Sequence, residues 1–294
     1  MLTQHKSGWP GVNSVAFLAV TWLILGSLAS FAHAQSNQPS HLNRLIATLA
    51  ADRLAFGAQN DVPADGTGLD WLFIDMEHSP YLLDRLEAKL GGLAASAAPT
   101  ITPIARIPLE GHEPFKWAIK QVLDAGVMGV VVPRIENREQ ALAVVRAMRY
   151  PPQKGGAHPE PAGARGYGPG RAAKLWGVEV REYLRRADLW PLNPSGDLLA
   201  VMLIETVEGV KNIDEILGVP GVGMVFIGPG DLGMSLGVGP GPSAEKDEAI
   251  AAVGTACRSR RAVCGLLITG GESEFKIRVA QGFRVFLGTT ARTR

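Results

Sequence analysis

The hydrophobic pattern alternates between short, mostly apolar runs and longer stretches that are apolar at helical spacing. The apolar runs predict eight strands, at residues 54–59, 71–75, 101–106, 128–133, 199–205, 223–228, 265–269 and 283–288. Residues 130–132 and 224–227 contain no polar position. Such continuous runs are typical of parallel strands that are covered on both faces.

Helical spacing predicts helices between these strands, at residues 81–93, 113–125, 136–148, 211–217 and 245–258. Pro114 fits a first-turn position and Gly126 follows the end of the same helix. Eight strands alternating with helices favour a barrel or a doubly wound sheet. Because no G-x-G-x-x-G motif opens a helix after the first strand, the sequence predicts an α/β fold of the (β/α)₈ TIM barrel type.

The predicted alternation of strands and helices is irregular near both ends of the chain. Residues 60–70 include Pro63, Gly66 and Gly68, so the first helix is expected to be shortened or missing. The chain ends six residues after the last strand, so we also expect the eighth helix to be missing. The apolar flank that this leaves would suit a partner subunit.

Residues 150–197 form a long insertion rich in Pro, Gly, Arg and Trp. Loops of this length are usually functional or disordered. Trp176, Tyr183 and Trp190 favour an ordered, lid-like loop, and an irregular surface excursion is the alternative.

The N-terminus has the pattern of an export signal. Residues 14–31 are almost wholly apolar, and Ala32-His33-Ala34 follows, a small-x-small pattern that signal peptidase cleaves. We therefore expect a signal peptide at 1–34, a single barrel domain at 35–294, and export to the periplasm. A transmembrane anchor is the alternative, because the apolar stretch has nearly spanning length. If the signal does not function, the protein is cytoplasmic.

Composition narrows the function classes. The chain is 46% hydrophobic and 19% charged with a net charge of +1, which is ordinary for a globular protein. The sequence contains no Lys/Arg run of the kind that binds nucleic acids. Apart from the N-terminal stretch, no segment is predicted to span a membrane. Cys257 and Cys264 are predicted to be buried, unpaired thiols, with pairing as the alternative in an exported protein. Two cysteines cannot form a four-ligand zinc site.

Polar residues gather where the predicted strands end, and in barrels these ends form one catalytic rim. The residues are Asp75, Glu77, His78, Arg106, Arg134, Glu205 and Asp231. Two carboxylates completed by waters and a chelating substrate are a usual way to hold Mg²⁺ or Mn²⁺. Glu205 and Asp231 are therefore candidate metal ligands, with ion pairing to Arg or Lys as the alternative. The Gly-rich turn at 228–230 favours the metal site, because its backbone N–H groups can approach a substrate carboxylate.

Three further residues are candidates for proton transfer and charge stabilisation. His78 is a candidate general base, because histidine titrates near neutrality. Arg106 is a candidate for stabilising developing negative charge, with an ion pair to Asp75 or Glu77 as the alternative. Asp124, late in the predicted helix 113–125, could orient His78 or could be an ordinary helix-end residue.

Six segments resemble the HpcH/HpaI aldolases, which are class II pyruvate aldolases, in order and over residues 54–288. The segments are 71–78 (WLFIDMEH), 119–126 (IKQVLDAG), 149–152 (RYPP), 165–168 (RGYG), 204–206 (IET) and 226–232 (FIGPGDL). The resemblance implies a metal-dependent lyase that cleaves or forms a C–C bond of 4-hydroxy-2-oxo acids, giving pyruvate and an aldehyde. It also implies Mg²⁺, Mn²⁺ or Co²⁺ as cofactor, no Schiff-base lysine, and a homo-oligomer such as a hexamer.

The resemblance also implies roles for individual residues. The metal ligands would be Glu205 and Asp231, and the base would be His78, paired with Asp124. Arg106 would contact the substrate oxygens, and the backbone N–H groups of Gly230 and Asp231 would hold the pyruvate carboxylate. Leu203 departs from the family, which often has Gln two residues before the metal-binding Glu. Two alternatives stay open: a degenerate exported barrel that binds a 2-oxo acid without turnover, and a related lyase that acts on a CoA thioester.

Overall fold

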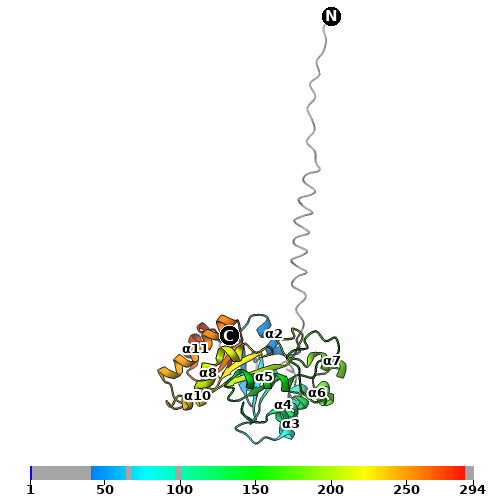
Figure 1. Ribbon diagram of the computed structural model, residues 1–294, viewed down its shortest axis with the longest axis horizontal. Coiled ribbons are helices and arrows are strands. Elements are labelled where there is room, and N and C mark those ends of the chain that lie inside the picture. The colour runs from blue at the N-terminus through cyan, green and yellow to red at the C-terminus, as the bar shows by residue number, and fades with distance from the viewer. Residues whose placement is uncertain (2–40, 64–67, 97–100, 289–294) are drawn as a thin grey trace. The chain divides into compact units, whose positions relative to one another are not determined.

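Eight parallel strands form a closed barrel in chain order, in a computed structural model that describes Met1 and residues 41–63, 68–96 and 101–288 (Figure 1). The strands are β1 (Ala55–Gln59), β2 (Trp71–Asp75), β3 (Thr102–Arg106), β4 (Gly129–Val132), β5 (Leu199–Ile204), β6 (Met224–Ile227), β7 (Cys264–Ile268) and β8 (Val285–Gly288). β8 pairs with β1 and closes the ring. The predicted fold class is confirmed, and every predicted strand overlaps an observed one.

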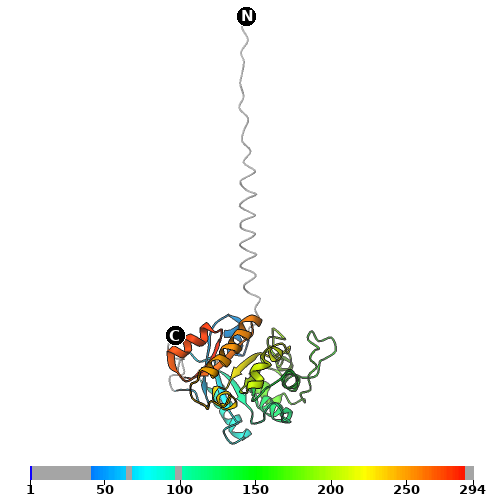
Figure 2. The same ribbon diagram turned by 60° about the vertical axis from the view of Figure 1, so that its left-hand side comes forward.

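Helices lie around the outside of the strands (Figures 1 and 2). They are α2 (Arg44–Ala50), α3 (Leu83–Ala95), α4 (Lys116–Ala125), α5 (Arg138–Met148), α6 (Gly170–Leu175), α7 (Val180–Arg186), α8 (Val207–Lys211), α9 (Ile213–Leu217), α10 (Pro229–Ser235), α11 (Ala244–Arg260) and α12 (Gly271–Ala280). The predicted helices correspond to α3, α4, α5, α8 with α9, and α11. The described residues between β1 and β2 contain no helix, which agrees with the expectation of a shortened first helix.

The barrel has an interior core and an outer core. Alternate side chains of each strand point inward, as Trp71 and Phe73 of β2 do, and they pack around Phe226 at ring-centroid distances of 5.8 and 6.2 Å. The outward-facing residues pack against the helix layer. Since side chains alternate, the inward row of β2 continues to Asp75, and the inward row of β5 continues through Leu203 to Glu205. The interior core therefore ends in polar groups at the C-terminal mouth.

Helix α2 closes the opposite, N-terminal end of the barrel, which we call the base. Its Leu45, Ile46 and Leu49 are at most 3% exposed and belong to the interior core. Asn43 caps the helix by accepting a hydrogen bond from the Ile46 N–H at 3.0 Å. The Asn43 amide also donates to the carbonyl oxygens of Met128 and Asp197. These hydrogen bonds of Asn43 fix the helix beneath the strands. The sequence analysis did not predict this helix.

The insertion at 150–197 is ordered, and its lid-like role stays a prediction. It contains α6 and α7, and the Trp176 indole donates to the Gly126 carbonyl at 2.9 Å. Arg165 donates to Asp124 of α4 at 2.8 Å. The segment leaves the end of α5 and returns to the start of β5, and both of these lie at the base. Its contacts are with the helix layer and the base, because the chain connections keep it away from the mouth.

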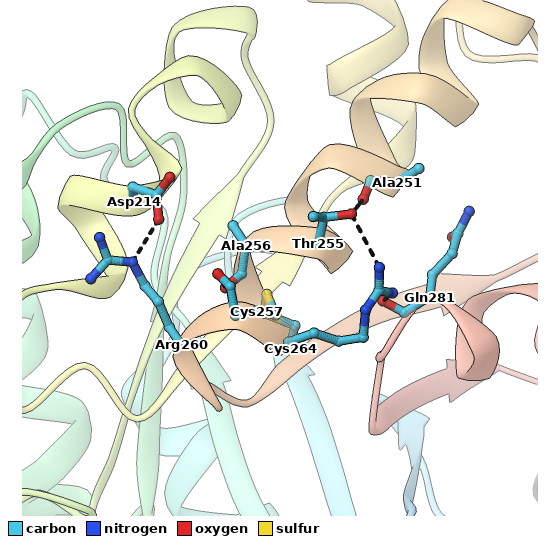
Figure 3. The surroundings of a disulfide bond; sticks show 10 residues. Asp214, Ala251, Thr255, Ala256, Cys257, Arg260, Cys264 and Gln281 are labelled. Carbon is cyan, nitrogen blue, oxygen red and sulfur yellow. Dashed lines mark hydrogen bonds and ion pairs between the residues drawn. A yellow bond between two sulfur atoms is a disulfide. The ribbon is translucent and has the colours of Figure 1, made fainter.

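Cys257 and Cys264 form a disulfide bond, so the prediction of two unpaired thiols is wrong (Figure 3). Cys257 lies near the end of α11, and Cys264 is the first residue of β7. The chain turns back after α11 through Arg261, which has a left-handed φ of 53°. The turn returns the first residue of β7 to the end of α11, where the two Cα atoms lie 6.2 Å apart.

Two sets of predictions lie outside the described residues. The signal peptide at 1–34, with its transmembrane alternative, falls in the range 2–40, and the predicted absence of an eighth helix concerns residues 289–294. Within the described residues, none of the helices combines the length and the apolar character that a membrane span requires.

Candidate active site

The mouth of the barrel brings together the polar ends of β2, β3, β5 and β6. Asp75 and Arg106 are register partners on neighbouring strands. Glu205 directly follows β5, and Asp231 lies in the first turn of α10, directly after β6. Parallel strands in register present their last residues at the same edge, so these groups converge as the sequence predicted.

Arg106 is held by two carboxylates. Its Nε and Nη2 donate to Asp75 Oδ1 and Oδ2 at 3.0 and 2.6 Å, and its Nη1 lies 2.8 Å from Glu77 Oε2. The guanidinium also lies 5.3 Å from the centre of the Phe73 ring. The ion pair with Asp75 and Glu77, our alternative for Arg106, is therefore present. It fixes the guanidinium within the mouth.

The pKa values around Arg106 reflect competition between burial and charge. Burial alone would raise the pKa of Asp75, but the hydrogen bonds and charge of Arg106 outweigh it and lower that pKa. The pKa of Glu77 is raised, because burial outweighs the attraction of Arg106 and His78. Burial opposes the charge of Arg106, yet Asp75 and Glu77 raise its pKa. Arg106 therefore stays cationic beside acids of unequal strength.

His78 stands at the edge of this cluster. Asp75 Oδ1 accepts hydrogen bonds from the backbone N–H groups of Glu77 and His78, at 3.1 and 3.4 Å, which fixes the backbone after β2. The His78 side chain is 65% exposed, and its Nε2 lies 3.7 Å from Glu77 Oε2. The imidazole is thus anchored through its backbone but accessible to a substrate at the mouth.

Glu205 is a buried carboxylate with few hydrogen-bond donors and no ion-pair partner among the described residues. The residue is 3% exposed, and Oε2 accepts one hydrogen bond, from the Arg134 backbone N–H at 3.3 Å. Within the described residues, neither Glu205 nor Asp231 forms an ion pair with Arg, Lys or His. Burial raises the pKa of Glu205 to about 8, with contributions from the negative charges of Asp231 and Glu77.

The turn from β6 into α10 is shaped around Glu205. A Cβ atom on Gly228 would overlap the Glu205 side chain, so a larger residue there would displace the carboxylate. Pro229 occupies the first helical position, and the first helical hydrogen bond runs from the Leu232 N–H to the Gly228 carbonyl. The N–H groups of Gly230 and Asp231 therefore have no acceptor within the helix. They remain available to an anion beside the two carboxylates.

These residues fit a divalent cation. Glu205 carries a buried carboxylate that lacks a cationic partner, and the charge of Asp231 acts on it directly. Mg²⁺ and Mn²⁺ are commonly held by one or two carboxylates, with substrate and water oxygens completing the shell. The described residues contain no cluster of three or more Asp, Glu, His or Cys side chains suited to a metal. The assignment of Glu205 and Asp231 as the two protein ligands of a cation stays a prediction.

Asp124 does not lie beside His78 within one chain. It is near the end of α4, which runs from the mouth toward the base and ends shortly before β4 begins. Its Oδ1 accepts a hydrogen bond from Arg165 Nη2 at 2.8 Å. His78 follows β2 at the mouth. The predicted pairing of these two residues thus has no counterpart in the contacts of the described chain.

A family model matches this architecture. The model described as HpcH/HpaI aldolase/citrate lyase covers residues 62–285. The chain belongs to the HpcH/HpaI aldolase/citrate lyase family. The matched range begins before β2 and reaches into β8, so it includes all of the mouth residues described above.

Two curated proteins have similar sequences. One, named hydroxypyruvate/pyruvate aldolase, is from Roseovarius nubinhibens and is 38% identical over 170 residues, which are 58% of this chain and 57% of that protein. The other, named 4-hydroxy-2-oxo-heptane-1,7-dioate aldolase, is from Klebsiella pneumoniae and is 37% identical over 180 residues, 60% of this chain and 58% of that protein. The chain thus matches a little over half the length of these relatives.

A solved HpcH/HpaI structure supports the same assignment. A family protein from Burkholderia cenocepacia superposes with a TM-score of 0.69 and 28% identity, covering 83% of this chain and 91% of that chain. The superposition covers nearly the whole of the family fold.

Sequence reasoning left three mouth residues without a role. Asp75 and Glu77 were noted only as possible partners of Arg106, and Arg134 only as a strand end. The structure shows that Asp75 joins Arg106 to the backbone of His78, and that Arg134 adopts a left-handed φ of 50° while its N–H contacts Glu205. The signal for Asp75 was its inward position at the end of β2. No sequence signal marks the backbone of Arg134.

Proposed function

We propose that this protein is a divalent-metal-dependent aldolase that cleaves or forms the C3–C4 bond of a 4-hydroxy-2-oxo acid, giving pyruvate and an aldehyde. The observation that carries the proposal is the buried Glu205 carboxylate, which has one backbone N–H partner and lies within the charge field of Asp231. The family and the names of the two curated relatives, which are aldolases of hydroxypyruvate/pyruvate and of 4-hydroxy-2-oxo-heptane-1,7-dioate, support it.

Glu205 and Asp231 would hold the cation. When bound, the cation supplies a Lewis acid that polarises the 2-oxo group and stabilises the enolate. The free N–H groups of Gly230 and Asp231 bind the substrate carboxylate. Arg106, clamped by Asp75 and Glu77, donates to the oxygen on which charge develops.

His78 serves as the base in the cleavage direction. It takes the proton from the 4-hydroxyl group, the C3–C4 bond breaks, and the bonding pair stays on the pyruvate fragment while the aldehyde leaves. The exposure of the His78 side chain gives it access to the substrate, and Asp75 holds its backbone.

The exchange of pyruvate methyl protons in D₂O, followed by mass spectrometry, tests the proposal. We expect exchange that depends on Mg²⁺, Mn²⁺ or Co²⁺ and is absent in Glu205→Ala. Glu208→Ala is the matched control, because this nearby glutamate side chain is 52% exposed and pairs with Lys211 rather than with a mouth residue. Exchange that persists in EDTA would rule out the scheme.

Turnover with pyruvate, Mn²⁺ and a panel of aldehydes identifies the second substrate. Metal-dependent exchange without any condensation product would instead indicate a barrel that binds a 2-oxo acid without completing the aldol reaction.

We also propose that the working form is a homo-oligomer. Asp124 and His78 lie at opposite ends of one barrel, so their predicted pairing requires two copies of the chain. Trp117 and Tyr167 are 47% and 76% exposed, which suits a contact between copies. Light scattering measures the assembly, and mixing His78→Ala with Asp124→Ala should restore exchange. A monomer with full exchange activity would contradict this proposal.

Export is a further part of the proposed function. The Ala32-His33-Ala34 pattern and the Cys257–Cys264 disulfide support it, because disulfides persist in oxidising compartments. Expression of the full chain in a Gram-negative host should give a periplasmic protein whose N-terminal residue is Gln35. Intact chain in the cytoplasmic fraction would contradict export.

A further inference from the structure

A cavity lies at the base of the barrel, at the opposite end from the proposed active site. Its volume is about 410 Å³, within the range of small-molecule sites. It is lined by the end of α2, the start of β6 and the chain segments that lead into β7 and β8. All of these belong to the N-terminal ends of the strands, so the cavity is separate from the mouth.

The wall of this cavity is strongly basic. Arg260, Arg261 and Arg284 line it, and the described part of the wall contains no carboxylate. Arg260 Nε pairs with Asp214 at 2.6 Å and Arg284 Nη2 with Asp52 at 3.0 Å, but both aspartates are exposed and lie outside the lining. The Arg261 side chain has no ion pair or hydrogen bond among the described residues. The cavity therefore keeps an excess of positive charge.

The disulfide holds the loop that carries two of these arginines. Cys257 and Cys264 bracket the sequence Arg-Ser-Arg-Arg-Ala-Val, so the bond closes a small ring around residues 258–263 (Figure 3). Inside the ring, the Ala262 N–H donates to the Cys257 carbonyl at 2.9 Å. Arg258 reaches sideways to the carbonyls of Ala280 and Gln281, which fixes the loop to α12. Arg260 and Arg261 are thus presented on a constrained backbone.

The rest of the wall is apolar. Leu49, Trp190, Leu217 and Val222 line the cavity, and Trp190 packs against the interior core. A guanidinium group matches phosphate oxygens by paired hydrogen bonds, and it is favoured over Lys wherever such planar recognition is needed. A ligand for this cavity should therefore combine a phosphate group with an apolar or aromatic portion.

We propose that the base cavity binds a phosphate ester of an aromatic or apolar group, with Arg260, Arg261 and Arg284 holding the phosphate and Trp190 contacting the apolar portion. The disulfide prepares the site by holding residues 258–263 in the binding conformation. This site goes beyond the proposed aldolase function and does not depend on it.

Calorimetric titration of the full chain with phenyl phosphate tests the site. We expect binding that weakens at least tenfold in Arg260→Gln/Arg261→Gln, because two charge-assisted contacts are lost. The matched control is Arg138→Gln/Arg181→Gln, which removes the same charge from exposed positions on α5 and α7. The control should bind like the unmodified chain. An unmodified chain that does not bind phenyl phosphate, or equal loss in both double variants, would overturn the proposal.

Inorganic pyrophosphate separates the contribution of the apolar wall. We expect phenyl phosphate to lose affinity in Trp190→Ala while pyrophosphate keeps its affinity. Thermal unfolding of each variant with and without ligand shows that the folded protein is being measured. Sedimentation with phosphatidylglycerol vesicles that needs the same arginines, without binding of phenyl phosphate, would assign the cavity to a lipid surface and overturn the small-molecule assignment.

Phosphate binding by a variant without the disulfide tests the role of that bond. Cys257→Ser/Cys264→Ser should bind phenyl phosphate several-fold more weakly, because the loop must then be ordered on binding. Pyruvate methyl exchange should be unchanged in this variant and in the arginine variants, since the mouth is intact. Unchanged phosphate affinity in the cysteine variant would overturn the preparatory role of the bond.

Discussion

The barrel buries a carboxylate at each end, and the two carboxylates differ in their hydrogen-bond and ion-pair partners. At the base, Asp197 is 0% exposed; Arg186 donates to it at 2.8 Å, the Asn43 N–H donates at 3.3 Å, and His41 Nδ1 lies 3.1 Å away. At the mouth, Glu205 is 3% exposed but accepts one backbone hydrogen bond at 3.3 Å. Helix α2 and the 150–197 segment thus meet at Asp197, whose carboxylate is neutralised and hydrogen-bonded. The Glu205 carboxylate at the mouth lacks such partners among the described residues.

This difference distinguishes a structural charge from a functional one. A buried carboxylate is costly unless cations and donors surround it. The base meets that requirement from within the chain, so Asp197 contributes to folding. The mouth does not, so Glu205 reduces stability unless a cation binds or a proton neutralises it. Perturbed groups of this kind cluster at functional sites.

The sharpest test of the comparison is Glu205→Gln. We expect pyruvate methyl exchange to fall by more than roughly 1000-fold, because a metal ligand and its Lewis acid are lost. The melting temperature in EDTA should rise above pH 8, where Glu205 is ionised and the amide removes an uncompensated buried charge, and should change little at lower pH. A melting temperature that falls steeply would mean that Glu205 is a structural residue like Asp197.

At the base, Asp197→Ala should have the opposite effect. We expect a loss of roughly 1 to 3 kcal/mol in the free energy of unfolding, because the buried Asn43 N–H loses its acceptor while Arg186 keeps its ion pair with Glu182. Urea unfolding measures the loss, and exchange activity should persist where the variant is folded. Asp214→Ala is the control: its ion pair with Arg260 is exposed, and its removal should change stability little.

The pH dependence of stability should reveal Glu205 in the metal-free protein. Its pKa is about 8 in the folded state against an ordinary value of 4.5, so between these values the folded protein binds more protons than the unfolded chain. The free energy of unfolding should therefore decrease as pH rises from 4.5 to 8, by up to roughly 4 kcal/mol. Urea unfolding in EDTA at several pH values, compared with Glu205→Gln, measures this. Parallel profiles for the two proteins would contradict the assignment.

A smaller effect is expected from Asp75→Asn. The amide keeps an acceptor for the backbone N–H groups of Glu77 and His78 but weakens the hold on Arg106. We expect kcat/KM to fall by roughly 10- to 100-fold, mainly through kcat, because the guanidinium is displaced from the developing charge. Asp84→Asn, at an exposed position on α3, is the control. An equal effect in both variants would mean that Asp75 does not position Arg106.

Much of the fold was predictable, because its signals are local. Short, mostly apolar runs marked every strand, and the parallel order of a barrel then assigned Asp75, Arg106, Glu205 and Asp231 to one rim without any coordinates. Helix α2 was missed because seven residues beside an export-like segment give a weak helical pattern. Its burial comes from residues of several strands that surround it at the base.

The partnerships of polar residues were less predictable. Asp124 was expected beside His78, but the direction of α4 carries it to the base and to Arg165. The cysteines were expected to be free, but a left-handed residue turns the chain so that they meet. Both outcomes depend on how the chain reverses between elements, and a few residues decide such reversals.

The sequence alone determined the closed barrel, its order of strands and the acids at its mouth, because the period of apolar residues fixes which side chains face inward. Only the tertiary structure decided which charges are neutralised. Compensation depends on distances between residues far apart in the chain, such as Asp197 and Asn43 at the base or Glu205 and Arg134 at the mouth. Those distances follow from the packing of whole elements, and no local pattern encodes them.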